Sequence, residues 1–281
     1  MSGHEECIKG SIHRGLPQGK EEMIHGLNTY VIGNSENPRG IIVIYSDGFG
    51  LGLPNNKLIA DSYAKSGEWL VYLPDFFKGD AMGLKLADIA IPIDKSQQSS
   101  LSYYTGLLAH VPTMVAWNLR NKFEPTNKTC MDFLKALREQ TPLKKKIGIV
   151  GFCWGGRYAI RAAKREYTVK VDGQEVPLVN AAVGLHPSSL AYPVDVEDLA
   201  VPVSFGWGEE DKFIKIEQKG QVEAIHEKAR AAGEKLPEIE HKVYKPGRHG
   251  FAVRGNPDDP AERRCLEESE KQVLTWFDRW L

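Results

Sequence analysis

Short apolar runs alternate with amphipathic stretches along most of the chain. We expect strands at residues 40–45, 69–73, 147–150, 178–185, 201–205 and 239–244, the first three of them buried. Between them, apolar residues recur at helical spacing, and we expect helices at 54–66, 127–139, 155–163, 217–232 and 261–281. Apolar strands that alternate with helices are typical of a parallel sheet with both faces covered. The sequence therefore predicts an α/β fold, with residues 1–281 as a single domain.

Some segments depart from this rhythm. Residues 1–22 are polar and predict an irregular lead-in, and residues 22–32 predict an edge strand or one arm of a hairpin. Residues 168–177 contain Asp172-Gly173, a pair that favours a hairpin turn. Residues 79–125 contain Pro92, Pro112 and Pro125. For this segment we expect an irregular helical insertion over the active-site face, with a long loop as the alternative.

The stretch from Ile147 to Arg157 combines an apolar strand, a glycine-rich turn and the start of a helix. Its centre is Gly151-x-Cys153-x-Gly155, the G-x-S-x-G pattern of a nucleophile elbow with cysteine in place of serine. A nucleophile on such a strained turn leaves no room for a Cβ two residues before or after it. The turn also places the cysteine at a helix N-terminus, which favours a thiolate. The alternative interpretation is a glycine-rich turn around an inert cysteine.

Four reactive side chains follow predicted strands: Asp47, Cys153, Asp211 and His249. In an open parallel sheet, ligands bind beyond the carboxyl ends of the strands. Nucleophile, acid and histidine in this order along the chain match the triad of an α/β-hydrolase. His249 would then act as the base, with Asp211 fixing its tautomer. Taken alone, Asp211 also fits a helix N-cap, and His249 a solvated loop histidine.

Composition excludes several function classes. The 36 Lys and Arg residues nearly balance the 37 Asp and Glu residues, so the chain offers no bulk attraction to nucleic acid or to an anionic membrane. No apolar run approaches the roughly 20 residues that span a bilayer. The N-terminus lacks the features of a secretory signal, and the four cysteines lie far apart without metal-ligand spacing. We therefore expect free thiols, a cytoplasmic protein and neither a metal site nor a cofactor.

Several segments of the sequence carry a family resemblance. Gly151-Phe-Cys-Trp-Gly-Gly156, Gly208-Glu-Glu-Asp211 and Gly247-Arg-His-Gly-Phe251 resemble the signature segments of the dienelactone hydrolase family, which is typified by carboxymethylenebutenolidase. Asp47-Gly-Phe-Gly50 and Pro74-Asp-Phe-Phe-Lys78 resemble two further family segments. The resemblance extends from about residue 40 to the C-terminal helix. It implies an α/β-hydrolase fold and a cofactor-free enzyme that opens an enol-lactone or a related ester.

The N-terminal region and the segment after the 178–185 strand resemble the fungal branch of this family. The residues concerned are Cys7, His13, Gly15 and Pro17 before Gly26-Leu-Asn-Thr-Tyr30, together with His186-Pro-Ser. By the same resemblance, Cys153 is the nucleophile, His249 the base and Asp211 the orienting carboxylate. The backbone N–H groups of Trp154 and Gly48 would form the oxyanion hole.

The resemblance also suggests substrate contacts, and here the sequence departs from the family pattern. The family has a glutamate that contacts the nucleophile where this chain has Asp47, which is one methylene shorter. The family arginine that binds a substrate carboxylate corresponds most closely to Arg254, displaced by one position because Val253 stands in its place. Lys78 is a second candidate anion contact. His186 is expected to line the pocket, with a competing role as base as the alternative.

Three function hypotheses remain at this point. The first is a thiol-dependent hydrolase of a small lactone, ester or thioester, acting as a monomer or homodimer through an acyl-enzyme. The second is a weakly catalytic ligand-binding or redox-sensing protein with Cys153 as an oxidisable thiol. The third is a serine esterase that uses Ser46 or Ser188, although neither serine lies in a G-x-S-x-G pattern.

Overall fold

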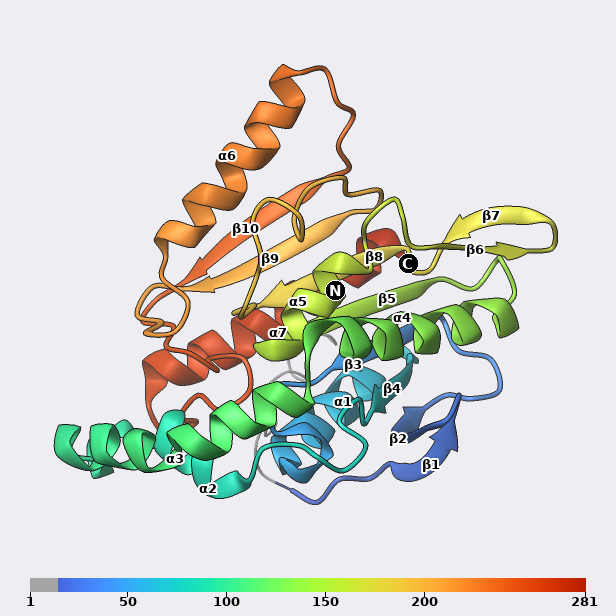
Figure 1. The fold of residues 1–281 in the computed structure, drawn as a ribbon. Coiled ribbons are helices and arrows are strands. Elements are labelled where there is room, and N and C mark those ends of the chain that lie inside the picture. The colour runs from blue at the N-terminus through green and yellow to red at the C-terminus, as the bar shows by residue number, and fades with distance from the viewer. Residues whose placement is uncertain (1–14) are drawn as a thin grey trace.

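The computed structural model describes residues 15–281 and contains an eight-stranded central sheet of order β1-β2-β4-β3-β5-β8-β9-β10 (Figure 1). The strands are β1 (Lys20–Ile24), β2 (Leu27–Gly33), β3 (Ile41–Tyr45), β4 (Leu70–Pro74), β5 (Ile147–Phe152), β8 (Ala181–Leu185), β9 (Val203–Gly208) and β10 (Ile239–Tyr244). Strand β2 pairs antiparallel with β1 and with β4, and all other neighbours are parallel. All six predicted strands are present, so the predicted α/β class is confirmed.

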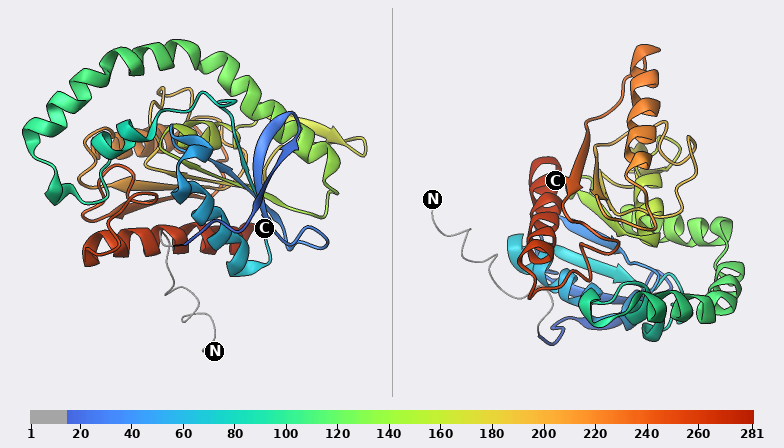
Figure 2. Two further views of the ribbon diagram at one scale, coloured as in Figure 1. Left: turned by 90° about the horizontal axis from the view of Figure 1, so that it is seen from below. Right: turned by 90° about the vertical axis from the view of Figure 1, so that its left-hand side faces the viewer.

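Helices cover both faces of this sheet (Figures 1 and 2). One face carries α1 (Pro54–Gly67) and α7 (Pro260–Trp280), and the other carries α4 (Phe123–Gln140), α5 (Trp154–Arg161) and α6 (Glu217–Ala231). Strand β3 shows why helices must cover both faces of the sheet. Its residues Ile41, Val43 and Tyr45 belong to the core under α4 and α5, whereas Ile42 and Ile44 belong to the core under α1 and α7. Because side chains alternate along a strand, an all-apolar strand must be buried on both sides.

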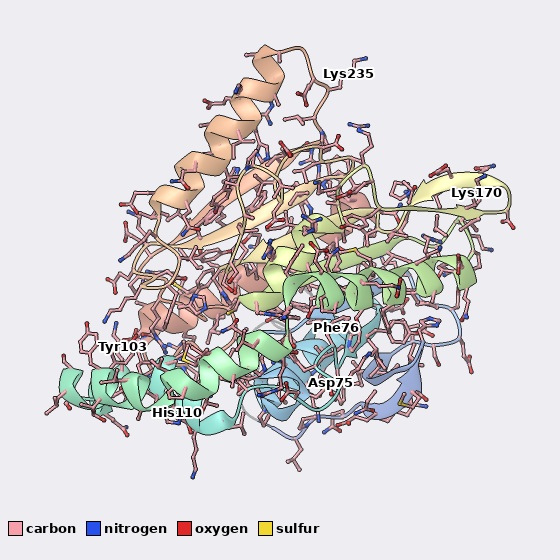
Figure 3. The ribbon with its side chains drawn as sticks, in the orientation of Figure 1. Asp75, Phe76, Tyr103, His110, Lys170 and Lys235 are labelled. Atoms are coloured by element: carbon pink, nitrogen blue, oxygen red, sulfur yellow. The ribbon has the colours of Figure 1, made fainter. Side chains whose placement is uncertain are left out.

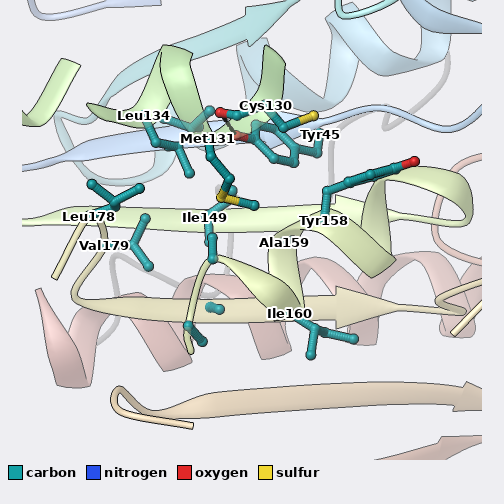
Figure 4. Close-up of a cluster of buried hydrophobic side chains, with 14 of the residues drawn as sticks. Tyr45, Cys130, Met131, Leu134, Ile149, Tyr158, Ala159, Ile160, Leu178 and Val179 are labelled. Atoms are coloured by element: carbon teal, nitrogen blue, oxygen red, sulfur yellow. Dashed lines mark hydrogen bonds between the residues drawn. The ribbon is translucent and has the colours of Figure 1, made fainter. Parts of the chain in front are cut away.

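The core between β5 and the helices α4 and α5 is close to the elbow (Figure 4). Met131 and Leu134 of α4 and Tyr158 of α5 belong to it and are buried. Tyr45, at the end of β3, is fully buried there, and its hydroxyl donates a 2.7 Å hydrogen bond to the carbonyl oxygen of Cys130. The polar group that enters this core is therefore satisfied, as buried polar groups must be.

The segment predicted as an irregular insertion is helical and more regular than expected. It contains the short helix α2 (Leu84–Ala90), the 3₁₀ turn η3 (Lys95–Gln97) and the 21-residue helix α3 (Ser100–Arg120). The long-loop alternative is wrong. Helix α3 continues through Pro112, a residue that normally interrupts a helix because it lacks an N–H donor. In Figures 1 and 2, α3 lies at the edge of the molecule, away from the central sheet.

The N-terminal prediction needs one correction, because β1 begins at Lys20, within the expected irregular lead-in. The rest of that lead-in, residues 1–14, lies outside the described residues. The predicted hairpin is confirmed: β6 (Thr168–Val171) pairs antiparallel with β7 (Gln174–Pro177), and Asp172 and Gly173 between them both have positive φ. Two positive φ values in a two-residue loop match the twist of the flanking strands. Between residues 15 and 281, no helix is both long and apolar enough to cross a bilayer.

Two histidines lie in the apolar layer between the sheet and α6. Trp207 donates its indole N–H to Nδ1 of His241 at 3.0 Å, and the ring of Phe205 stacks on the same histidine at 4.8 Å. His226 of α6 has its Nε2 2.8 Å from the carbonyl oxygen of Val196. Burial lowers the pKa of both imidazoles, and the pKa of His241 falls to about 4. This layer therefore favours neutral histidines.

This burial predicts that acid destabilises the fold. In the unfolded chain His241 takes up a proton as the pH falls below about 6.5, whereas in the folded chain it stays neutral until about pH 4. Its stabilising contribution is complete above pH 6.5 and is lost as the pH falls to 4. We expect this loss to be about 2–3 kcal/mol of unfolding free energy.

Urea unfolding at pH 7 and at pH 4.5 measures the loss. The control is His241→Asn, whose side-chain oxygen accepts from Trp207 without titrating. The variant should lose less stability than the wild type between the two pH values. An equal loss in both proteins would contradict the assignment to His241.

Candidate active site

The turn after β5 has the geometry of a nucleophile elbow. Cys153 has φ 50° and ψ −114°, a strained conformation for a residue with a Cβ, and it stands at the N-cap of α5. A Cβ added at Gly151 would lie 2.3 Å from the carbonyl oxygen of Gly155. A Cβ added at Gly155 would lie 2.2 Å from the carbonyl oxygen of Tyr45. Real Cβ atoms do not approach backbone so closely, so the predicted need for both glycines is confirmed.

The structure brings together the three residues of the predicted triad. Nε2 of His249 lies 3.0 Å from Sγ of Cys153, and its Nδ1 lies 2.8 Å from Oδ2 of Asp211. The other carboxylate oxygen of Asp211 accepts 2.8 Å hydrogen bonds from the backbone N–H groups of Phe213 and Ile214. Asp211 is therefore both a local cap and the partner of His249. Its side chain is fully buried, which fixes the orientation of the imidazole.

The electrostatics of this trio favour a charged histidine. Burial alone lowers the pKa of His249, but the charge of Cys153 and the hydrogen bonds to Asp211 and Cys153 outweigh it and raise the pKa to about 10. At neutral pH the site therefore favours an imidazolium between a carboxylate and the sulfur. A positive ring 3.0 Å from Sγ stabilises the thiolate form of a cysteine, which is the nucleophilic form.

Two backbone N–H groups, those of Trp154 and Gly48, lie in the turn and the loop that meet at the elbow. Trp154 is the first residue of α5, and Gly48 follows β3 in the neighbouring loop. Within residues 15–281, neither of these N–H groups donates a hydrogen bond to another part of the chain. The two loops are tied together because the N–H of Gly155 donates to the carbonyl oxygen of Ser46 at 3.1 Å. Free donors at a helix N-terminus are suited to stabilise an oxyanion.

Asp47 lies in the same loop but is not seen in contact with Cys153. Its Oδ1 accepts hydrogen bonds of 3.0 Å from the N–H of Phe49 and from Nδ2 of Asn56. Its Oδ2 is buried and has no hydrogen-bond partner in the part of the chain that the structure describes. Burial raises the pKa of Asp47, while the hydrogen bonds and the charges of Arg254 and His249 partly offset the rise. The shorter side chain is thus held by the N–H of Phe49 in its own loop and by Asn56 of α1.

His186 contacts the nucleophile through the backbone instead of lining the cavity. The N–H of Cys153 donates to Nδ1 of His186 at 3.0 Å and also to the carbonyl oxygen of Leu185 at 3.1 Å. Since a backbone N–H only donates, this Nδ1 carries no proton. Burial and the nearby His249, whose ring centroid is 5.2 Å away, lower the pKa of His186. The hydroxyl of Ser188, two residues later, lies 3.6 Å from Sγ of Cys153.

A cavity of about 330 Å³ opens beside His249. Its wall comes from the insertion and from the loops around Asp211 and His249, with Tyr103 contributed by α3 (Figure 3). The lining residues are Ala90, Ile91, Pro92, Lys95, Gln98, Ser100, Tyr103, Tyr104, Glu210, Lys212, Phe213, Arg248 and His249. The volume is suited to a small organic molecule, and the wall combines apolar side chains with many polar and charged ones. The insertion therefore covers one side of the site.

The predicted anion contacts Arg254 and Lys78 are not in this wall. Arg254 is buried, donates to Oδ1 of Asp88 at 2.8 Å, and lines a separate cavity of about 660 Å³ on the other side of Pro92. Lys78 is exposed and lies in the turn after β4. The sequence reasoning missed Lys212, which lines the cavity with its Nζ 5.2 Å from the ring centroid of Tyr103. The sequence signal that could have identified Lys212 as a cavity residue is its position directly after Asp211.

Comparison with known proteins agrees with this geometry. The model of the dienelactone hydrolase family matches residues 27–281. The chain is 29% identical to the hydrolase pyvD of Aspergillus violaceofuscus, over 98% of this chain and 96% of that protein. It is 28% identical to dienlactone hydrolase 1 of Gibberella moniliformis, over 98% and 93%. A putative dienelactone hydrolase structure from Klebsiella pneumoniae has a TM-score of 0.57 at 20% identity, over 94% and 99% of the two chains. The predicted α/β-hydrolase fold is confirmed.

The contact at Gly155 yields a stability prediction. Gly155→Ala should destabilise the protein by roughly 3 kcal/mol or more, because its Cβ would meet the carbonyl oxygens of Tyr45 and Ser46 and the backbone must move. Gly220→Ala, in α6, is the matched control. No atom lies within 4 Å of the added Cβ there, and alanine should stabilise the helix by about 0.5–1 kcal/mol. Urea unfolding of both variants measures the difference. Similar stability of both variants would mean that the elbow accommodates a Cβ.

Proposed function

Since this chain belongs to the dienelactone hydrolase family, we propose that it hydrolyses a small lactone or ester with Cys153 as the nucleophile. The observation that carries the proposal is the unbroken chain of contacts at the elbow. Sγ of Cys153 lies 3.0 Å from Nε2 of His249, and Nδ1 of the same ring lies 2.8 Å from Asp211. A nucleophile, a base and an orienting acid at these distances are the requirements for covalent acyl transfer.

In the first half-reaction, the thiolate of Cys153 attacks the carbonyl carbon of the substrate. The carbonyl oxygen becomes an oxyanion and accepts hydrogen bonds from the N–H groups of Trp154 and Gly48. The imidazolium of His249 then gives its proton to the leaving alkoxide as the carbon–oxygen bond breaks. A thioester with Cys153 results, and a lactone substrate stays attached through its opened ring.

In the second half-reaction, the now neutral His249 takes a proton from water, and the resulting hydroxide attacks the thioester carbonyl. The collapse of this second oxyanion releases the acid and regenerates the thiolate beside an imidazolium. Asp211 keeps Nδ1 protonated throughout, so that Nε2 always faces the sulfur. This cycle consumes only water and needs no cofactor. We propose that it runs in the cytoplasm, on a monomer or homodimer with a single catalytic domain.

The charge of the cavity suggests the substrate class. Two of its cations are already paired with the carboxylate of Glu262: Arg248 at 2.9 Å and Lys95 at 3.7 Å. Lys212 has no carboxylate partner within residues 15–281, and it lies beside Tyr103 at the cavity wall. We propose that Lys212 binds a carboxylate of the substrate. Arg254, paired with Asp88, would instead hold the loop after His249.

The alternative function is a ligand-binding or redox-sensing protein with little catalysis. It would use Cys153 as an oxidisable thiol, and a buried acid behind His249 would serve no purpose there. A thioesterase would use the same triad, so the substrate panel decides between thioesters and oxygen esters. The serine-esterase hypothesis has one supporting contact, because the Ser188 hydroxyl lies 3.6 Å from Sγ of Cys153. No described histidine is seen bonded to that hydroxyl.

The proposal predicts that Cys153→Ala abolishes the nitrophenolate burst from nitrophenyl acetate. Turnover should fall at least about 10³-fold, because the nucleophile is gone and the remaining site offers only binding and the oxyanion hole. The melting temperature should change little, since a methyl group replaces a thiol without a clash.

The role of Asp211 as the orienting acid is tested by Asp211→Asn, with Glu209→Gln as the matched control. Asp211→Asn should reduce turnover strongly, whereas Glu209, a half-exposed partner of Lys245, should tolerate the change. A burst that survives in Cys153→Ala would exclude the acyl-enzyme at this residue. A loss in Glu209→Gln equal to that in Asp211→Asn would exclude Asp211 as the specific acid.

A third prediction concerns substrate charge. Lys212→Met should raise KM about tenfold for an ester that carries a carboxylate and should leave the KM of a neutral ester nearly unchanged. Lys215→Met is the control, since Lys215 is exposed three residues later and does not line the cavity. Steady-state kinetics with one acidic and one neutral ester measure the effect. Equal changes for both esters would mean that Lys212 does not recognise charge, without affecting the assignment of the triad.

A further inference from the structure

Helix α3 carries an exposed apolar stripe that the catalytic site does not use. Its members are 45% to 74% exposed, and they are Leu101, Tyr104, Leu108, Val111, Val115 and Leu119. At 3.6 residues per turn these positions fall within about 80° of the helix circumference. Steps of three and four residues are those of a helix that packs lengthwise against another helix. We call this set the α3 stripe.

The other face of α3 already has partners in the molecule. Trp117 is buried, packs on Trp154, and donates its indole N–H to the carbonyl oxygen of Asp80 at 2.6 Å. Tyr103 lines the cavity beside His249. The α3 stripe therefore lies on a second face, and α3 is at the edge of the molecule in both views of Figure 2.

The stripe is large for a surface without a partner. Taking roughly 150–220 Å² for each fully exposed residue, the six positions leave about 600 Å² open to solvent. That is the upper end of the largest apolar patch on a typical monomer. Doubled across two molecules it gives about 1,200 Å², which reaches the lower bound of a stable specific interface.

The order of residues along α3 matches a second copy of the same helix. A two-fold axis between Leu108 and Val111 turns the stripe onto itself in the antiparallel direction, as an isologous interface requires. The facing pairs are Leu101 with Leu119, Tyr104 with Val115, and Leu108 with Val111. Each pair sets a larger side chain against one of equal or smaller size.

Charge also favours a second copy over a membrane surface. Helices that bind anionic membranes carry Lys and Arg along their polar face. From Ser100 to Leu119, α3 contains no Lys, Arg, Asp or Glu, and Arg120 is bound to Asp80 by two 2.9 Å hydrogen bonds. Two copies therefore meet without like-charge repulsion. We propose that α3 is the dimer interface of this protein, formed by antiparallel pairing of the two α3 stripes.

This interface is continuous with the catalytic cavity. Tyr104 belongs to the α3 stripe and also to the cavity wall that contains His249. Pairing of the stripes would therefore bring the second copy to the cavity entrance. The triad itself is complete within one chain, so the dimer bears on substrate entry and not on the chemistry.

Analytical ultracentrifugation over a concentration series tests the proposal. The wild type should sediment as a dimer at micromolar concentration. Leu108→Glu should raise the dimer dissociation constant at least about 100-fold, because each dimer loses two buried leucines and gains two charges. Thr113→Glu is the control, an exposed position on the same helix but off the stripe, and it should leave the constant unchanged. Circular dichroism and esterase activity verify that both variants are folded.

The register is tested separately by disulfide formation. Mixing Leu108→Cys protein with Val111→Cys protein under mild oxidation should give a cross-linked product well above that of either variant alone. A monomeric wild type at 50 µM would overturn the proposal, as would a dimer unaffected by Leu108→Glu. Binding of a monomer to neutral phosphatidylcholine vesicles, lost in Leu108→Glu, would assign the stripe to a lipid surface instead.

Discussion

The active site depends on the close approach of the elbow to the end of β3. Gly155 has its Cα against the carbonyl oxygens of Tyr45 and Ser46, and its N–H donates to Ser46. This contact holds Cys153 in a conformation that a residue with a Cβ seldom adopts. It also holds the loop that contains Gly48 next to the start of α5, where Trp154 lies. The strain at one residue is thus supported by the packing of two strands that are neighbours in the sheet.

Two histidines near the nucleophile have opposite protonation preferences: His249 favours the charged form and His186 the neutral form. The two preferences depend on each other. His249 is stabilised as an imidazolium by Asp211 and Cys153, whereas His186 is buried and accepts a hydrogen bond on Nδ1. Their ring centroids are only 5.2 Å apart, and two positive rings at that distance repel strongly in a buried site. A neutral His186 therefore allows His249 to carry the proton. It also orients the backbone of Cys153, a role that does not require contact with substrate.

The sequence predicted the structure well wherever a local pattern is compatible with only one backbone conformation. Short strand patterns predicted all six strands, most of them as apolar runs, and the glycines around Cys153 predicted the elbow, because few other turns exclude a Cβ there. Substrate contacts were less predictable, since Arg254 and Lys212 both lie within five residues of a triad member and nothing in the local pattern separates their roles. Only the folded loops decide that Arg254 faces Asp88 and that Lys212 faces the cavity. Helix α3 was obscured by Pro112, whose local preference the rest of the helix overrides.

The insertion is mechanically coupled to the catalytic turn, because its last turns pack on the elbow. Trp117 of α3 contacts Trp154, and both rings contact Phe77 from the turn after β4, with centroids 4.5 to 6.2 Å apart. Trp154 also carries one of the two N–H groups that we propose for the oxyanion hole. A shift of α3 would therefore move the side chain of Trp154, and the backbone N–H of the same residue belongs to the proposed oxyanion hole. The same helix forms the cavity wall, so the position of α3 links the shape of the substrate site to the geometry of the nucleophile.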